Sequence, residues 1–306
     1  MRNEKFLRDF DWNLLMTFLV IAEEGGITAA SRRLFRTQPS LSNALTRLER
    51  LVGQRLIDRR PGVFALTDAG RRLHEKALQA CRSVESVGDM ADRQAKLTGR
   101  ITYHIASHID CPPLDAALSQ LHADEPEVTF AAIVSPTDEI VTGIREGTIA
   151  LGFAVLQGPM PGLTCRHLND NEMGFFCGPT HPLFGQTGLT IKDLDGHDYV
   201  SFESDQLSAG LESVARLGLA GRFRDRLIAT SPNDEELMRL IEAGIGFGPL
   251  VLPMAEIHAA AGRLWRLPPY DNLPRVRNFL VTNPKTVLSS SEQRFVELIE
   301  ERLRGE

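Results

Sequence analysis

The stretch from Ile27 to Thr67 restricts the fold of this chain more than any other part of the sequence. Its first part, residues 29–34, fits one compact helix of about two turns, for which Thr28 is the predicted N-cap. Phe35 and Arg36 form a predicted turn, because a second helical pattern starts directly after them. The stretch therefore predicts a short helix, a tight turn and a longer helix.

The second helix has one apolar face and one polar face. Thr37 is its predicted N-cap, and Pro39 lies in its first turn, where a missing N–H costs nothing. The residues that recur at helical spacing and are expected to face a core are Leu41, Ala44, Leu45, Leu48 and Leu51. The opposite stripe carries Pro39, Ser42, Asn43, Thr46 and Arg50. Short polar side chains near the N-terminal end are what a recognition helix presents to base edges in a major groove.

Arginine dominates the charge of this stretch. From Arg32 to Arg60, eight arginines stand against Glu49 and Asp58, a local balance of +6. Such an excess attracts the phosphate backbone of a nucleic acid whatever its base sequence. Taken alone, the two helices also fit a small α-hairpin with a solvated arginine face.

A predicted hairpin directly after the second helix favours nucleic-acid binding over the plain α-hairpin. Apolar residues at 56–57 and 64–66 flank Pro61-Gly62, which is a turn dipeptide. Arg59 and Arg60 stand on this hairpin. The combination predicts a winged helix-turn-helix.

These residues resemble the LysR-type bacterial transcriptional regulators. The segments that stand where the family's winged helix-turn-helix pattern has them are ITAASRRL (27–34), TQPSLS (37–42), Leu48-Glu49, Arg59 and LTDAG (66–70). Asn43 stands where the family often has arginine, and Leu56-Ile57 where it often has Leu-Phe, so the resemblance leaves the DNA half-site sequence open. It implies a DNA-binding domain at residues 1–66.

The polar stripe and the arginines have two predicted roles. Gln38, Ser42 and Asn43 are predicted to contact base edges. Thr37 and Ser40 are predicted to help through backbone or hydroxyl contacts, with Pro39 between them. The arginines predicted to contact phosphates or the minor groove are Arg32, Arg36, Arg47, Arg59 and Arg60.

Length and composition set the broad class. The chain has 306 residues and a hydrophobic fraction of 42%, enough for two or three globular domains. It has no apolar run near about 18 residues, and its first residues are charged, so we expect no membrane helix, no secretory signal and a cytoplasmic location. The net charge of −6 divides into +3 for residues 1–70 and −9 for the remainder. An acidic body with a basic head fits a protein that docks on DNA by one end.

The four cysteines show no paired spacing. They are Cys81, Cys111, Cys165 and Cys177. We expect reduced thiols, with a redox sensor as the alternative.

A long helix is predicted from Thr67, within a linker at residues 67–96. Its apolar positions follow steps of four and three, which is a heptad seam rather than a broad globular stripe: Leu73, Ala77, Ala80, Val84, Val87 and Ala91. Pairing with a second copy is the favoured explanation, and a helix lying on its own domain is the alternative. A dimer would place two recognition helices about one DNA turn apart.

After Gly99 short strands alternate with helices, so the chain is predicted to be α/β overall. The first half has predicted strands 101–106, 128–134 and 149–155 and helices 113–123 and 137–146, an order that implies a parallel sheet. The second half has predicted strands 163–168, 172–177, 198–202, 227–229 and 247–252 and helices 207–217 and 234–243. Segments 264–267 and 277–282 and a helix at 290–304 return to the first half.

This region resembles the effector domain of LysR-type regulators more weakly, through Gly147, residues 181–183 (HPL) and residues 242–246 (EAGIG). That domain is similar to periplasmic binding proteins and takes a small inducer between two lobes. We therefore predict an effector domain at 97–306, with lobe I at 97–163 and 268–306 and lobe II at 164–267. Ala150 stands where relatives commonly carry Asp.

Strand ends predict the lining of a cleft, because ligands in open parallel sheets bind at the carboxyl ends of the strands. The predicted lining is Ser107, His108, Ile109, Ser135, Thr137, Phe153, Phe202, Ser204, Thr230 and Phe247. Ser107 and Thr137 match positions whose hydroxyls contact effectors in the family. Both stand at predicted helix starts, which favours a carboxylate-bearing inducer. Simple capping by Ser107, Ser135 and Thr137 is the alternative.

Metal and catalytic sites are not expected. The possible metal ligands His104, His108, Asp110 and Cys111 are not expected to meet at one ion, because four residues along a strand span about 13 Å. Gly244, Gly246 and Gly248 follow a predicted helix and open a strand, which is the reverse of a dinucleotide-binding loop. No GxSxG, HExxH or P-loop pattern occurs. We expect no cofactor and no enzyme activity.

The resemblance implies a sequence-specific transcriptional regulator, activator or repressor, whose promoter binding is modulated by a small effector. Its expected partners are double-stranded promoter DNA, the effector and further copies of itself as a dimer or homotetramer, with RNA polymerase as a candidate. A ligand-sensing module whose basic head binds a protein is one alternative. A transferase or hydrolase on the two-lobed body is the other.

Gln38→Ala or Asn43→Ala is expected to cost about 1–3 kcal/mol of binding free energy and to relax specificity at one base position. Arg60→Ala is expected to weaken binding to all duplexes and to flatten its salt dependence. Fluorescence anisotropy on operator and random duplexes at several salt concentrations measures both effects. Equal losses of affinity for both duplexes in all three variants would contradict this division between residues that read bases and residues that contact phosphates.

Overall fold

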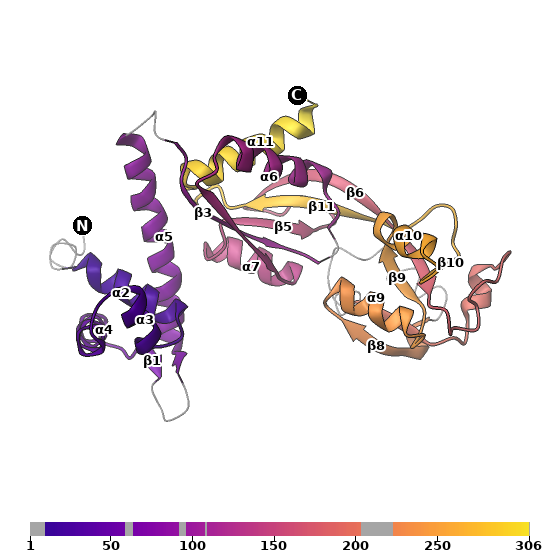
Figure 1. Ribbon diagram of the computed structural model, residues 1–306, viewed down its shortest axis with the longest axis horizontal. Helices are drawn as coiled ribbons and strands as arrows, with labels where there is room; N and C mark the ends of the chain where they lie inside the picture. Colours follow the sequence, from indigo (N-terminus) through magenta and orange to yellow (C-terminus); the bar gives the residue numbers. More distant parts are fainter. Residues whose placement is uncertain (1–9, 59–63, 92–95, 108, 203–222, 306) are drawn as a thin grey trace. The chain divides into compact units, whose positions relative to one another are not determined.

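The computed structural model describes residues 10–58, 64–91, 96–107, 109–202 and 223–305. The chain divides into two compact units, Met1–Arg93 and Gln94–Glu306. Figure 1 shows the described helices of the first unit, one of them much longer than the others, and sheets covered by helices in the second unit. Within the described residues, no single helix is long and apolar enough to cross a membrane; the helices Trp12–Glu23 and Ile27–Arg33 have that length and composition only when taken together, and the chain bends by 116° between them.

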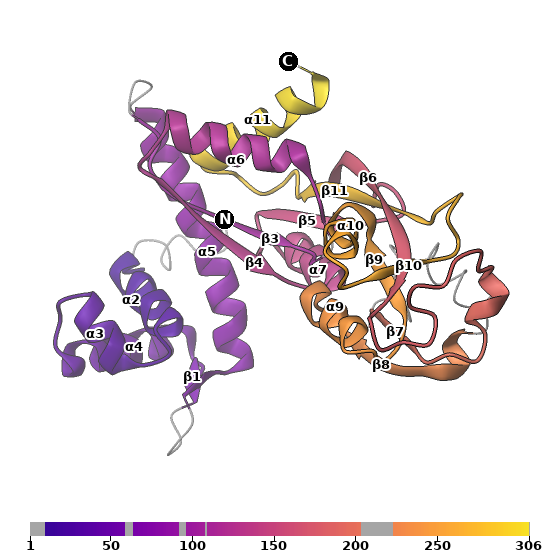
Figure 2. The same cartoon turned by 45° about the vertical axis from the view of Figure 1, so that its right-hand side comes forward.

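In the described part of the first unit, α2 (Trp12–Glu23), α3 (Ile27–Arg33) and α4 (Gln38–Val52) come first along the chain and lie together in Figure 2. Asp11 caps α2 by accepting a hydrogen bond from the backbone N–H of Asn13 at 3.0 Å. The predicted helix-turn-helix is confirmed. Thr28 is not the cap of α3, because Gly26 takes the cap position and Thr28 lies inside the helix.

The buried side of α4 holds the first unit together. Leu41, Leu45 and Leu48 are buried against Phe18 and Ile21 of α2, as the helical spacing predicted. Leu51 is exposed, which corrects the prediction that it faces the core. Its neighbour Val52 packs at that end of the helix instead.

A two-stranded wing follows α4, as predicted. Strand β1 (Ile57–Asp58) pairs antiparallel with β2 (Ala65–Leu66). The Glu49 side chain fixes the wing to α4, because its Oε1 accepts from the backbone N–H of Leu56 at 2.9 Å. Arg59 and Arg60 lie outside the described residues.

The long helix α5 spans Asp68–Ala91 and starts where Thr67 Oγ1 accepts from the Gly70 N–H at 3.0 Å. Ala77 is 1% exposed and packs against Leu15 and Leu19 of α2, with Leu73 beside it. The expectation that Leu73 and Ala77 face a second copy is therefore corrected, since these seam positions bury surface against their own domain. Val84 is 53% exposed.

Of the other seam positions, Ala80 is half-buried. The side chains of Val87 and Ala91 lie outside the described part of the chain.

Lobe I of the second unit is a sheet with helices on both faces. Strand β3 (Gly99–Ile105) lies between β4 (Val128–Val134) and β5 (Leu151–Val155), all parallel, as predicted. Strand β11 (Arg275–Thr282) extends the sheet antiparallel to β5. Helices α6 (Pro112–Asp124) and α11 (Ser290–Arg304) cover one face, and α7 (Thr137–Glu146) covers the other.

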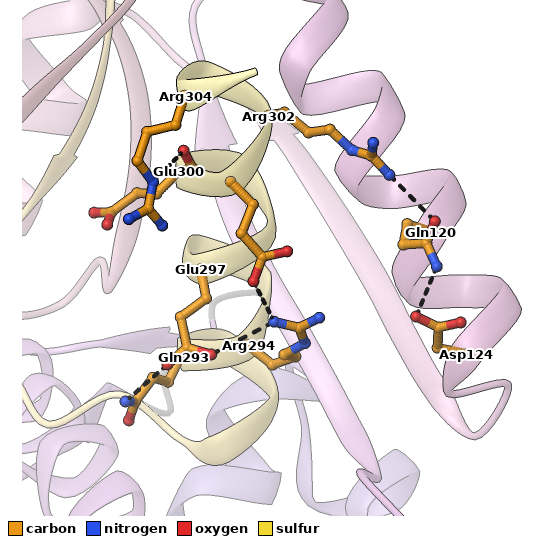
Figure 3. A network of polar contacts seen from close by, with 9 residues as sticks. Gln120, Asp124, Gln293, Arg294, Glu297, Glu300, Arg302 and Arg304 are labelled. Atoms are coloured by element: carbon orange, nitrogen blue, oxygen red, sulfur yellow. Dashed lines mark hydrogen bonds and ion pairs between the residues drawn. The ribbon is translucent and has the colours of Figure 1, made fainter. Parts of the chain in front are cut away.

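A polar network joins α6 to α11 on the surface of lobe I (Figure 3). Arg302 Nη2 donates to Gln120 Oε1 at 3.2 Å, and Gln120 Nε2 donates to Asp124 at 2.8 Å. Beneath it, Phe295 packs against Tyr103 and Phe153. The aromatic rings therefore pack in the core, whereas the side chains of the polar network are at the surface, where water weakens their interactions.

Strand β6 (Thr164–Cys177) belongs to both lobes. Its first part pairs with β11 from Thr164 to Glu172, and its last part pairs with β9 (Gly248–Val251) and β10 (Trp265–Leu267). The two strands predicted at 163–168 and 172–177 are thus one continuous strand. The lobe boundary predicted at residue 164 is corrected to the neighbourhood of Glu172.

Lobe II contains a parallel pair, β7 (Tyr199–Phe202) and β8 (Leu227–Ser231), followed by α9 (Asp234–Glu242). Its core is an aromatic cluster that includes Phe175, Tyr199, Phe223 and Phe247. Helix α10 (Leu252–Ala260) was not predicted, because the apolar run of β9 passes into it without a polar cap. The helix predicted at 207–217 lies outside the described residues.

Asn233→Ala is expected to reduce the free energy of unfolding by about 1 kcal/mol, because the Asn233 side chain accepts from the backbone N–H groups of Glu235 and Glu236 at the start of α9. Asn233→Gly is the matched control and should cost only about a few tenths of a kcal/mol. Urea unfolding followed by circular dichroism measures both. An alanine variant as stable as the glycine variant would show that the cap contributes little.

Candidate nucleic-acid interface and ligand cleft

The predicted nucleic-acid contacts lie in accessible positions on α4, in the turn before it and on α3. Ser42 is half-buried, and the other described members of the predicted set are exposed: Arg32, Arg36, Thr37, Gln38, Pro39, Ser40, Asn43 and Arg47. Thr37 takes the N-cap position but makes no side-chain cap hydrogen bond, contrary to the prediction. The N-terminus of α4 therefore presents unsatisfied N–H groups beside short polar side chains, a combination suited to phosphate and base contacts.

The arginines of this face differ in their ion pairs. Arg33 Nη1 lies 2.8 Å from Glu23 and 3.0 Å from Glu24, so its charge is compensated within the first unit. Arg47 lies 3.8 Å from Asp11, and both side chains are well exposed, so this pair is weak. Arg32 and Arg36 make no ion pair with a carboxylate of the described residues, which leaves their charges available to phosphate.

The segment after β3 lies between the two lobes. Ser107 Oγ donates to the backbone carbonyl of Pro232 in lobe II at 3.0 Å. Ile109 packs against the cores of both lobes. Ser107 and Ile109, which were predicted to line the cleft, thus contact both lobes, whereas His108 lies outside the described residues.

Two other predicted hydroxyls make contacts inside lobe I. Thr137 Oγ1 accepts from the Val155 N–H at 3.4 Å. Ser135 Oγ is 3.0 Å from His104 Nδ1, and burial lowers the pKa of His104. His104 is therefore neutral at neutral pH and can share one proton with Ser135. Neither hydroxyl acts as the side-chain cap of α7, so the capping alternative does not hold for them.

Three aromatic residues were predicted in the cleft and lie in the lobe cores instead. Phe153, Phe202 and Phe247 are each 0% exposed. Side chains alternate between the two faces of a strand, so a position at a strand end does not decide which way the ring points. Thr230 is half-buried beside Ser201 in the β7–β8 pair, and Ser204 lies outside the described residues.

An asparagine cluster at the crossing between the lobes was missed by sequence reasoning. Asn278 Nδ2 donates to Asn171 at 2.5 Å and to Asn169 at 3.1 Å. The amide groups of Asn169 and Asn171 in turn donate to the backbone carbonyl of Asp110 at 2.7 and 3.0 Å. The cluster ties the segment after β3 to β6 and β11. The sequence signal that could have found the cluster is the spacing of Asn169 and Asn171, because residues two apart in a strand lie on the same face.

Asp234 is a second residue that sequence reasoning missed. It stands two residues after Pro232, the lobe II partner of Ser107, and is 4% exposed. Burial, with a smaller contribution from the Glu235 charge, raises the pKa of Asp234 to about 7. Its Oδ1 has no hydrogen-bond partner among the described residues. A carboxyl that changes charge near neutral pH therefore lies next to the contact between the lobes.

A separate cavity of about 350 Å³ lies in lobe II. It is lined by Gln186, Thr187, Gly188, Ala259, Leu264, Trp265, Arg266 and Tyr270. Within the described residues, no group of three or more His, Cys, Asp or Glu side chains is placed to hold a metal ion.

Both units match family models. Residues 12–71 match the bacterial regulatory helix-turn-helix protein, lysR family, and residues 94–304 match the LysR substrate binding domain. The chain is 29% identical over 180 residues to the HTH-type transcriptional activator BauR of Pseudomonas aeruginosa, a match that covers 58% of this chain and 59% of BauR, less than two thirds of that protein.

Longer matches support the same assignment. The chain is 23% identical over 290 residues to the Hca operon transcriptional activator HcaR of Escherichia coli, which covers 94% of this chain and 97% of HcaR. The crystal structure of full-length CbnR with its target DNA has a TM-score of 0.65 and 21% identity, with 95% of this chain and 99% of that chain covered. This likeness shows that the two proteins share a fold.

Asp234→Asn is expected to stabilise the protein more at pH 8 than at pH 5. The folded protein keeps a proton on Asp234 up to about pH 7, whereas an unfolded Asp loses it near about pH 4. The contribution of Asp234 to the free energy of unfolding of the wild type therefore falls as pH rises from about 4 to about 7. Asp234→Asn carries a neutral amide, so its stability lacks this dependence on pH. Thermal midpoints across this range measure the difference, with Glu236→Gln as an exposed control. A difference that stays constant with pH would contradict the burial of a protonated carboxyl.

Proposed function

The chain belongs to the LysR family of bacterial transcriptional regulators, and from this premise we propose which surfaces contact DNA, effector and a second copy. It is a DNA-binding transcriptional regulator with an effector-binding domain. The observation that carries the proposal is the exposed polar face of α4 beside Arg32 and Arg36, which make no ion pair with a carboxylate of the described residues. We also propose a cytoplasmic location, where bacterial promoter DNA lies.

We propose that α4 enters the major groove, with Gln38, Ser42 and Asn43 at base edges. Exposure of Gln38 and Asn43 near the N-terminal end of α4 supports this assignment. The arginines beside them would contact phosphates and supply the salt-dependent part of the affinity.

The experiment is a gel-shift assay with the full chain and the promoter upstream of its own gene, at several salt concentrations. Salt-sensitive retardation, stronger than on a random duplex of equal length, is expected. Absence of any retardation would favour the alternative in which the basic head binds a protein, which the helix-turn-helix match does not favour.

We propose that a small, carboxylate-bearing effector binds between the lobes. The support is Ser107, whose hydroxyl bridges to Pro232, and the N-terminus of α7, which has no side-chain cap. An effector that replaces the Ser107–Pro232 contact would act by its unequal affinity for two arrangements of the lobes.

A thermal-shift screen with succinate and benzoate as aliphatic and aromatic probes tests the effector proposal. A sensor is stabilised by its ligand without consuming it, whereas an enzyme turns it over. The same probes, followed by nuclear magnetic resonance, therefore separate sensing from a transferase or hydrolase. No shift with any carboxylate would oppose a carboxylate-bearing effector.

We propose that the chain forms a dimer or tetramer through the later seam positions of α5, which are Ala80, Val84, Val87 and Ala91. The support is the exposure of Val84 in a helix whose earlier seam positions are already packed. RNA polymerase remains a candidate partner of the DNA-bound assembly.

Val84→Asp is expected to lower the mass of the assembly by at least half, because a charge in an apolar seam must be desolvated when two helices pair. Sedimentation velocity at micromolar concentration measures the mass. Val287→Asp is the matched control, since Val287 is similarly exposed but lies in the effector-binding unit. An unchanged mass for the Val84 variant would assign the interface elsewhere.

A further inference from the structure

Phe35, in the turn between α3 and α4, is exposed in a backbone conformation that does not suit it. It is 96% exposed, and its φ is 52°. Among the described non-glycine residues, Asn272 is the other one with positive φ. Asparagine tolerates this left-handed region, whereas a bulky side chain there is a real outlier.

The turn itself does not need the phenyl ring. The Phe35 N–H donates to the carbonyl of Arg32 at 3.3 Å, and the Arg36 N–H donates to that of Ser31 at 3.1 Å. These backbone bonds hold the turn whatever side chain stands at position 35. Glycine or asparagine would fit the same geometry without strain and without an apolar ring in water.

The surroundings of the ring indicate what covers it. Arg36, Thr37 and Gln38 follow Phe35 directly, and Arg32 lies on the preceding helix; all four side chains are exposed. Glu23 and Glu24, at the end of α2, are paired with Arg33. An apolar ring bordered by arginines that no carboxylate of the described residues pairs with is complementary to a polyanion that also has apolar surface. Duplex DNA has this chemistry in its deoxyribose edges and thymine methyl groups.

We propose that Phe35 is a DNA-contacting residue whose ring packs on a deoxyribose or a thymine methyl at the margin of the major groove when α4 docks. This inference rests on the proposed docking of α4 and adds an apolar contact from the turn. Burial of the ring in the complex offsets the strain and exposure that Phe35 has in the free protein.

The test compares Phe35→Asn with Leu51→Gln in the full chain. Leu51 is 36% exposed at the opposite end of α4, so its variant controls for loss of surface apolar area. Phe35→Asn is expected to bind an operator duplex about threefold to tenfold more weakly, with a thermal midpoint no lower than that of the wild type. The slope of log affinity against log salt should not change, because no phosphate contact is lost, whereas Arg36→Ala should reduce it.

Three outcomes would overturn the proposal: binding by Phe35→Asn as tight as by Leu51→Gln, a fall in midpoint that accompanies the loss of affinity, or a reduced salt slope. Phe35→Tyr should retain the affinity. Duplexes with uracil in place of thymine distinguish the two contacts, since only a methyl contact weakens with uracil. If the wild type binds no duplex, the docking of α4 fails; if it binds and Phe35→Asn equals it, only this inference fails.

Discussion

The packing of the α4 leucines against α2 is the constraint on which the DNA-binding unit depends. Leu41, Leu45 and Leu48 are buried against Phe18 and Ile21, and burial of each such side chain contributes about 1.5–3 kcal/mol. This apolar contact sets the rotation of α4 about its axis. Any other rotation would bury Asn43 or Arg47 without partners, which is costly. The polar stripe therefore faces outward as a consequence of core packing.

In the same unit, the seam positions of helix α5 differ in their burial. The first turns of α5 bury Leu73 and Ala77 against α2, whereas Val84 is exposed further along. The heptad spacing continues through both parts, because steps of four and three keep residues on one helical face whatever covers that face. The beginning of α5 thus completes the DNA-binding core, whereas its own domain leaves Val84 exposed.

In the effector-binding unit, the shared strand β6 and the asparagine cluster determine the geometry between the lobes. The Asn169 and Asn171 side chains donate to the backbone carbonyl of Asp110, and Asn278 of β11 donates to both of them, so the cluster fixes the segment at Asp110 to β6 and β11. Ser107 lies three residues before Asp110, so this attachment also restricts the position of Ser107. A ligand that moves Ser107 relative to Pro232 therefore acts on a segment already joined to both lobes, which is how a local contact can bias their arrangement.

Periodicity and capping residues in the sequence determined the helices α4, α7 and α11, the wing and the parallel strands β3, β4 and β5. Their signals are local: Gly147 takes a left-handed conformation after α7, and Ser289 caps α11. Sequence also located the exposed face of α4. Tertiary structure alone decided that Ala77 packs on α2, that Phe153 and Phe247 turn into the cores, and that Asp234 loses its water. The reason is physical: spacing along the chain specifies which residues share a face, but burial and a shifted pKa depend on which distant segment excludes water from that face.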